Sequence, residues 1–295
     1  MKAYIMPPDV PSHAVTRVME ALARHAPRYP QRHVDIVSNI NDADLVVLNV
    51  IGRQDKIRAL TEKLTQQRKR YAVIQYCLKS TLRPHTQGWL PIWIDAEVVW
   101  SYLDLQAAIH DDRASRVPWN FYHAPLGVDN KVFFSQSLRT DRPYIICTSG
   151  QSYLTESVRE CILAARRAGR AIIHLGPELN MSGVTCLSGL DDRTLAKMYR
   201  QCEFVSGLRR KEGFELPAAE GLVCGARPIL FDQPHYRAWY KPWAEFVPEG
   251  TRGEVIDALE GLFRAGARPV EKSERDAAKQ RFDWKVIVKG FWKRC

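Results

Sequence analysis

Two glutamates eight positions apart, Glu212 and Glu220, are the first indication of a ligand-binding site in this sequence. They stand in the stretch EGFELPAAEG, in which Gly213 and a phenylalanine follow the first glutamate and Pro217 lies between the two. Ionised carboxylates are acceptor-only groups, so the pair suits a ligand rich in hydroxyl donors. Acidic residues that simply stabilise the start of a helix are the alternative interpretation.

The flanking residues predict that this pair lies at a junction between a strand and a helix. The preceding stretch YRQCEFVSGLRRK predicts a helix, a short apolar strand and a basic turn, and the following LVCGARPILFD predicts the end of a helix and another strand. Such junctions are where open α/β sheets bind ligands. Gly213 permits close approach of the backbone, Pro217 suits a first helical turn, and the free amides of a helix start favour a diphosphate.

Short apolar segments alternate with amphipathic ones along most of the chain. Segments such as ADLVVLNVI, YAVIQYC and RPILFD are almost continuously apolar, as strands covered on both faces are. Alternating strands and helices predict parallel sheets of the doubly wound type. The stretch VPWNFYHAPLGVDNKVF has no helical period and predicts a domain boundary. We therefore expect an α/β protein with two Rossmann-like domains facing a central cleft.

Composition sets the broad class of the protein. The chain has 295 residues, 45% of them hydrophobic and 26% charged, as in an ordinary globular protein. No apolar run approaches the ~18 residues that cross a bilayer, and the N-terminus does not resemble a signal peptide. The seven scattered cysteines form no C-x-x-C pair, which favours buried thiols in a reducing compartment. We expect a cytoplasmic protein.

The net charge of +10 favours polyanionic partners such as nucleic acid, anionic lipid or a phosphorylated substrate. A surface tuned for solubility explains the same charge. The sequence does not predict the oligomeric state.

Four motifs of the C-terminal half resemble, in the same order, those of the retaining GT-B glycosyltransferases, the family that includes glycogen and sucrose synthases. The motifs are PLGVDNKVF, GLDDRTLAKMYRQCEFVSG, EGFELPAAEGLVCGARPIL and RFDWKVIVKGFW, within residues 123–292. The resemblance implies a GT-B fold, a nucleotide-diphosphate sugar as donor, retention of anomeric configuration, and chemistry that needs no metal or other cofactor. It also implies three segments: an acceptor domain over 1–125, a nucleotide-sugar domain over 126–275, and a C-terminal helix over 276–295 that crosses back to the first domain.

Carried over to this sequence, the resemblance implies that Glu212 faces the sugar hydroxyls and Glu220 accepts hydrogen bonds from the ribose. The predicted donor-binding set is Gly150, Gln151, Arg210, Gly213, Phe214, Glu215, Leu216 and Glu220.

The donor half departs from the family at the residues that neutralise the diphosphate. An arginine and then a lysine are expected after the first strand of this half, where Gln151 and Thr155 stand. Either transfer activity has been lost, or the charge comes from the adjacent basic residues 209–211. We favour relocation, because a guanidinium binds phosphate bidentately and keeps its charge. The predicted catalytic residues are therefore Glu212, Arg209 and Lys211; a solvated basic turn is the alternative.

The N-terminal half departs further from the family. PPDVPSH replaces its glycine-rich loop, and Gln75 and Tyr76 stand where a histidine is often found. We predict His13, Gln75 and Tyr76 as acceptor-side residues, although a lone histidine in a capping turn is more often structural. The sequence DAD at 42–44 matches a metal motif of the other major glycosyltransferase fold, but its position favours an acidic turn.

Three functions stay open at this point. The favoured acceptor is DNA with a hydroxymethylated base, the substrate of some phage transferases of GT-B architecture. The basic charge and the tryptophans at 89, 93, 100 and 119 support it, since a basic, aromatic surface suits an exposed base. The first alternative is an envelope glycan or lipid-linked saccharide met at a membrane surface. The second is a non-catalytic binding module with the same fold.

Overall fold

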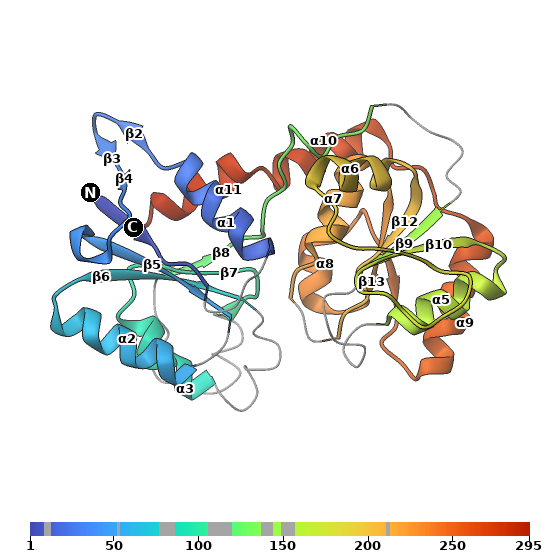
Figure 1. Cartoon of the computed structure of the whole chain (residues 1–295), viewed down its shortest axis with the longest axis horizontal. Coiled ribbons are helices and arrows are strands. Elements are labelled where there is room, and N and C mark those ends of the chain that lie inside the picture. Colours follow the sequence, from blue (N-terminus) through green and yellow to red (C-terminus); the bar gives the residue numbers. More distant parts are fainter. Residues whose placement is uncertain are drawn as a thin grey trace. The chain divides into compact units, whose positions relative to one another are not determined.

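The computed structural model describes residues 1–8, 13–51, 54–76, 86–105, 120–136, 144–148, 157–210 and 213–295. The chain divides into two compact units, each an α/β body of its own (Figure 1). Unit 1 comprises Met1–Gly127, Lys211–Phe214 and Trp284–Cys295, and unit 2 comprises Val128–Arg210 and Glu215–Asp283. The division falls at 127/128, whereas we expected 125/126.

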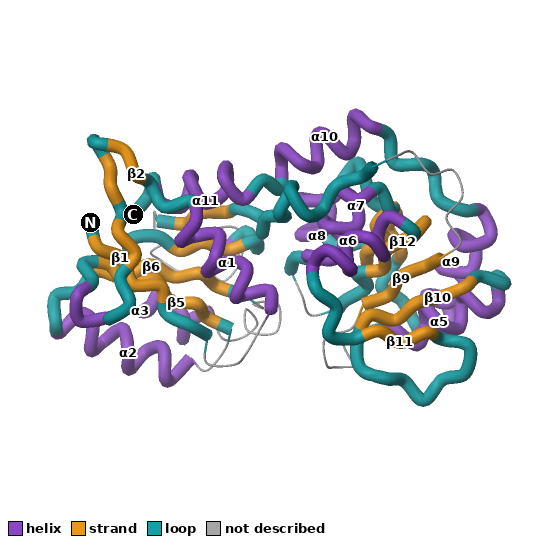
Figure 2. The backbone as a smooth tube through the Cα atoms, turned by 45° about the horizontal axis from the view of Figure 1, so that its top comes forward, coloured by secondary structure: helices purple, strands orange, loops and turns teal. Residues whose placement is uncertain are grey.

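Unit 1 is built on a parallel sheet with the strand order β4-β1-β5-β6-β7-β8. Helices α1 and α11 lie on one face of this sheet and α2 and α3 on the other (Figures 1 and 2). The strands are β1 (Lys2–Ile5), β4 (Asp35–Ile36), β5 (Leu45–Val50), β6 (Arg70–Gln75), β7 (Val99–Ser101) and β8 (Phe121–His123), with a separate antiparallel hairpin of β2 (Arg28–Tyr29) and β3 (Arg32–His33). The helices are α1 (His13–Arg24), the short 3-10 helix η1 (Ile40–Asp42), α2 (Gln54–Gln66), α3 (Thr86–Ile94) and α11 (Trp284–Trp292).

The sheet of unit 1 is covered on both faces, as its continuous apolar runs predict. Every residue of β5 is buried, and so are five of the six residues of β6. Helix α3 and strand β8 are among the elements that the sequence analysis did not predict. Helix α3 contains Pro91, which masks its helical pattern, and β8 lies in the stretch where we expected the domain boundary.

Three of the four tryptophans that supported a nucleic-acid acceptor belong to the core of unit 1. Trp89 is 2% exposed, and Trp93 and Trp100 are fully buried. Trp119 lies outside the described residues. Because the buried rings pack against other side chains, they cannot stack on a base.

The C-terminal segment is two helices rather than the single helix expected over 276–295. Helix α10 (Lys272–Arg281) belongs to unit 2, and α11 belongs to unit 1. Helix α11 packs against the sheet of unit 1, where the ring of Trp284 lies 6.4 Å from that of Trp100 and the ring of Phe291 lies 5.7 Å from it. The indole of Trp292 donates to the carbonyl of Leu22 at 3.1 Å.

Unit 2 is a second parallel sheet, with the strand order β11-β10-β9-β12-β13-β14. Helices α5 and α9 pack together and contact its strands, while α6, α7 and α10 form a second packed group. The strands are β9 (Tyr144–Thr148), β10 (Ala171–Leu175), β11 (Thr185–Leu187), β12 (Cys202–Ser206), β13 (Arg227–Phe231) and β14 (Glu245–Val247). The helices are α5 (Val158–Arg167), α6 (Asp192–Arg200), α7 (Leu216–Cys224), α8 (Pro234–Tyr240), α9 (Arg252–Ala265) and α10. Asp191 caps α6 by accepting a hydrogen bond from the Thr194 amide.

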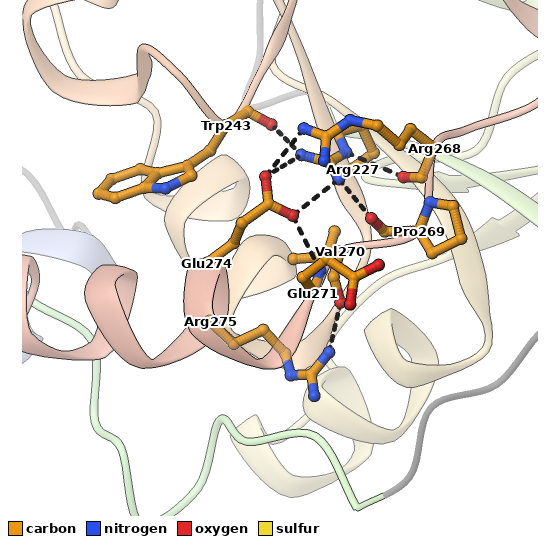
Figure 3. A network of polar contacts seen from close by, with 8 residues as sticks. All are labelled: Arg227, Trp243, Arg268, Pro269, Val270, Glu271, Glu274 and Arg275. Carbon is orange, nitrogen blue, oxygen red and sulfur yellow. Dashed lines mark hydrogen bonds and ion pairs between the residues drawn. The ribbon is translucent and has the colours of Figure 1, made fainter.

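A buried arginine fastens α10 to this sheet (Figure 3). Arg227 begins β13, is 1% exposed and makes a bidentate pair with Glu274 of α10, with distances of 3.2 and 3.1 Å. It also donates to the carbonyls of Trp243, Arg268 and Pro269. A guanidinium has five N–H donors, and this arrangement satisfies it with a carboxylate and three carbonyls.

No helix in the described part of the chain is long and apolar enough to cross a membrane.

Candidate functional site

The sheet of unit 2 has a topological switch point between β9 and β12. From β9 the chain continues outward to β10 and β11, then returns to β12 on the other side of β9. Connections that leave two neighbouring strands in opposite directions open a crevice at the carboxyl ends of those strands, where doubly wound sheets bind ligands. The residues after β12 and the start of α5, the helix that follows β9, are therefore where a site is expected.

Arg210 follows β12 and reaches the start of α5. Its Nη1 donates to the Oγ of Ser157, the residue before α5, at 2.6 Å, and the Ser157 amide donates to the carbonyl of Leu208 at 3.0 Å. The guanidinium carbon lies 4.8 Å from the centre of the Phe231 ring, and Nε lies 3.7 Å from a carboxylate oxygen of Glu249. A cation thus stands at a helix start whose own partial charge is positive, a combination that attracts anions.

This placement bears on the missing phosphate-binding cations. Gly150, Gln151 and Thr155 lie outside the described residues, but Ser157 is only two positions beyond Thr155. Arg210 therefore brings a guanidinium, from the loop after β12, to the start of α5, the helix that follows the segment where the resemblance implies an arginine and a lysine.

Arg209 turns toward a buried carboxylate. Its Nε lies 3.4 Å from Oε2 of Glu215, whose side chain is fully buried while that of Arg209 is 19% exposed. The Tyr236 hydroxyl donates to the Arg209 carbonyl at 3.1 Å and approaches Oε1 of Glu215 at 3.4 Å. The Tyr240 hydroxyl donates to the Glu215 carbonyl at 2.5 Å. Burial, followed by the charge of Glu215, raises the pKa of Tyr240, so this hydroxyl keeps its proton.

Helix α7 carries Glu220 and begins directly after Glu215. Pro217 occupies its first turn, as predicted. Glu220 is 2% exposed. The amides of Ala218 and Ala219 both donate to the Glu215 carbonyl, and a proline has no amide proton. The helix start therefore offers a diphosphate fewer amides than we expected, which leaves more of the task to side chains.

The remaining predicted catalytic and donor-binding residues have other surroundings. Lys211 and Glu212 lie outside the described residues. Gly213 and Phe214 are grouped with unit 1, where a Cβ on the glycine would lie 2.6 Å from side-chain atoms of both Tyr102 and Leu103. That glycine is thus explained by packing, and its role in sugar binding stays a prediction. Leu216 is 8% exposed.

The predicted acceptor-side residues receive little support. Gln75 is 1% exposed, and its Oε1 accepts a hydrogen bond from the Trp93 indole at 3.2 Å. Tyr76 is 4% exposed, and its hydroxyl donates to Asn49 at 3.0 Å. Both side chains stabilise the core of unit 1. His13 is the first residue of α1, and its side chain lies outside the described part.

In the part of the chain that the structure describes, no group of three or more His, Cys, Asp or Glu side chains could hold a metal ion. The DAD sequence has a structural role, because Asp44 accepts a hydrogen bond from the Lys2 amide at 2.8 Å beside the first strand.

Four residues of the unit 2 network described above were not predicted from the sequence: Ser157, Tyr236, Tyr240 and Glu249. One signal was available for two of them. Tyr236 and Tyr240 are four residues apart on α8 and so share a helix face. In the family motif E-G-F-G-L-P, which EGFELP of this chain resembles, a glycine stands at the position of Glu215. A carboxylate added there needs nearby donors if it is buried.

Three solved structures resemble the whole chain. Sucrose-phosphate synthase from Thermosynechococcus elongatus matches with a TM-score of 0.74 at 15% identity, over 99% of this chain and 97% of the other. HepE from Anabaena, solved with UDP and glucose, matches with 0.71 at 13% identity, over 99% and 98%. A UDP-forming trehalose-phosphate synthase from Burkholderia vietnamiensis matches with 0.62 at 13% identity, over 94% and 77%. The chain therefore has the GT-B fold of these glycosyltransferases, as its motifs predicted.

No protein-family model matches the sequence, and a comparison with curated proteins found no match. At these low identities the likeness establishes the fold alone.

Proposed function

We propose that the protein is a glycosyltransferase that takes a sugar from a nucleotide-diphosphate sugar held on unit 2. The observation that carries this proposal is the position of Arg210. The loop after β12 brings it to the start of α5, at the switch point of the sheet. In a GT-B fold that lacks the usual cations after β9, an arginine in this position supplies the charge that a diphosphate requires.

The chemistry assigned to the site is electrostatic and positional. A bond forms between the acceptor oxygen and the anomeric carbon while the bond from that carbon to the diphosphate breaks, and the acceptor proton leaves with the phosphate. Arg210 and Arg209 stabilise the negative charge that develops on the departing diphosphate. Glu220 is assigned to the ribose hydroxyls and Glu212 to the sugar. Attack on the face from which the diphosphate departs retains configuration, and the proposal requires neither a protein nucleophile nor a metal ion.

A thermal-shift screen against UDP-, GDP-, ADP- and dTDP-sugars tests the donor site. A ligand at a hundred times its dissociation constant stabilises the folded state by about 2.7 kcal/mol, which gives a visible shift. We expect one nucleotide class to respond, and Arg210→Gln to reduce the response. Arg264→Gln is the matched control, because Arg264 is exposed on α9 and paired with Glu260. Silence from all four classes contradicts the donor site.

For the acceptor, we propose DNA with a hydroxymethylated base, supported by the net charge of +10. Trp89, Trp93 and Trp100 do not add to this support, because all three are buried in the core of unit 1. The test is transfer to a duplex that contains hydroxymethylcytosine, followed by mass spectrometry of the DNA. We expect the mass of one sugar residue to be added, with binding that weakens steeply as salt rises. An unmodified duplex is the control, and absence of binding at low salt excludes DNA.

One observation favours the membrane-associated alternative. Helix α11 buries its apolar face in unit 1 and exposes Lys285, Val286 and Lys289, the valine to 61%. An exposed apolar residue between lysines suits an anionic membrane surface. Flotation with vesicles of phosphatidylglycerol and phosphatidylcholine, compared with phosphatidylcholine alone, distinguishes this acceptor class from DNA.

A non-catalytic binding module is the remaining alternative. Donor binding without hydrolysis or transfer, unchanged by Glu212→Ala or Arg209→Ala across a panel of acceptors, is the result that favours it.

A further inference from the structure

The best-defined feature of the site is a carboxylate that its proposed chemistry does not use. Glu215 replaces a glycine of the family motif, is fully buried, and directly precedes α7, where it contacts two tyrosines of α8. A buried carboxylate is costly unless donors surround it, and this one lies next to the guanidinium of Arg209 and the hydroxyl of Tyr236. The burial thus indicates a specific role in holding Arg209.

The surroundings are shaped to fit this side chain. A Cβ placed on Gly207 would lie 2.9 Å from Cγ of Glu215 and 3.0 Å from its Cβ, so only a glycine leaves room for the carboxylate stem. The Tyr240 hydroxyl fixes the backbone of Glu215 through its carbonyl, and the Tyr236 hydroxyl fixes the backbone of Arg209 in the same way. Both ends of the Arg209–Glu215 pair are therefore anchored to α8.

The two arginines differ in what holds them. Arg210 donates to Ser157 at 2.6 Å and lies 3.7 Å from Glu249, whose side chain is 33% exposed. Arg209 instead forms an ion pair at 3.4 Å with Glu215, whose side chain is fully buried. Glu215 contacts Nε, the guanidinium nitrogen nearest the backbone. A phosphate that approaches end-on uses the two Nη atoms, so a carboxylate at Nε directs the guanidinium without occupying those atoms.

We propose that Glu215 is a positioning residue that aims Arg209 at the donor diphosphate. This inference rests on the proposed function, since it requires a diphosphate at the switch point. A carboxylate in place of glycine ties an arginine from the loop after β12 into a fixed direction. The pair thereby compensates for the cations that are missing after β9.

A double-mutant cycle tests the inference by calorimetric titration with UDP, ADP, GDP and dTDP, using whichever of these binds the wild type. We expect Glu215→Gln and Arg209→Gln each to weaken binding by about tenfold or more, the scale of one charge-assisted hydrogen bond. We expect the double variant Arg209→Gln/Glu215→Gln to be no weaker than Arg209→Gln alone, because Glu215 acts through Arg209. Arg209→Gln leaves the buried carboxylate of Glu215 without its cation. If Arg209→Gln does not fold for that reason, Arg209→Lys replaces it in the cycle, because the lysine keeps a positive charge beside Glu215.

The control and the contrary outcomes are distinct. Glu249→Gln removes the exposed carboxylate of the neighbouring pair and should change affinity less than Glu215→Gln. Additive losses in the cycle overturn the positioning role, and tighter binding by Glu215→Gln overturns it as well, because the carboxylate then competes with phosphate. If the wild type binds none of the four nucleotides, the proposed function fails first and the inference falls with it. If the wild type binds and the cycle is additive, only the inference fails.

Discussion

The ion pair between Arg227 and Glu274 allows a stability prediction with a worked magnitude. Burial alone would raise the pKa of Glu274, but hydrogen bonds from Arg227 and Arg268 outweigh it and lower the pKa from 4.5 to about 2. The side chain of Glu274 is only 15% exposed, so solvent screens the interaction weakly. The difference between these two pKa values corresponds to about 3 kcal/mol of stability, at ~1.4 kcal/mol for a tenfold change in the protonation equilibrium. Glu274→Gln should therefore lower the free energy of unfolding by about 3 kcal/mol at pH 7.

The pH dependence of this contribution follows from the direction of the shift. Because the folded-state pKa is the lower one, the contribution is present above pH 4.5 and is lost as the pH falls toward 2, with about half gone by pH 3. Urea unfolding followed by circular dichroism, for wild type and variant between pH 7 and pH 3, measures both effects. The variant should lose less stability than the wild type over this range.

The control for this experiment lies on the same helix. Asp276→Asn breaks an ion pair with Lys272, whose side chain is 80% exposed, and should leave the unfolding midpoint almost unchanged. If Glu274→Gln unfolds within 0.5 kcal/mol of the wild type, roughly the range of ordinary surface substitutions, the reasoning from burial and pairing is refuted.

Two further predictions concern packing and thiol reactivity. Gly221→Ala places a Cβ 2.5 Å from Cγ1 of Val205 and should destabilise unit 2 by about 1–3 kcal/mol in thermal unfolding, whereas Gly261→Ala, with no atom within 4 Å, should be neutral or stabilising. Equal effects of the two alanines would contradict the close contact. Burial raises the pKa of the Cys224 thiol to about 12, so iodoacetamide at pH 8 should label it only in urea, while the partly exposed Cys186 reacts in the native protein. Rapid native labelling of Cys224, read by peptide mass spectrometry, would be the contrary result.

The sequence allowed much of the architecture to be predicted, because both sheets are parallel and buried on both faces. Continuous apolar runs such as β5 and β13 have no other simple interpretation. The helices of the C-terminal half were also predictable where capping residues and glycines mark their ends, as at Asp191 and Gly225. Elements without such punctuation were missed, among them α3 with its internal proline and the short strand β8.

Only the part of the candidate site that forms local sequence patterns could be predicted, because the rest depends on tertiary contacts between residues distant in the sequence. The motif around Glu220 and the basic pair 209–210 were visible as sequence patterns, and the structure brings both to one end of the sheet. The partners of that pair come from distant positions, Ser157 on one side and Tyr236 and Glu249 on the other. No local pattern links these residues, because only the order of the strands makes them neighbours. Gln75 and Tyr76 show a different limit of sequence patterns, since the side chains that pair with them inside the core, Trp93 and Asn49, come from other elements.

Hydrogen exchange with mass spectrometry, with and without a saturating nucleoside diphosphate, tests most directly that the donor site lies on unit 2. The account predicts slower exchange at residues 206–210, in the first turn of α5 and in the first turn of α7, because these segments surround the switch point. Arg210→Gln should reduce that protection. Protection confined to unit 1, or absent from these segments while the nucleotide binds, would contradict the proposed site.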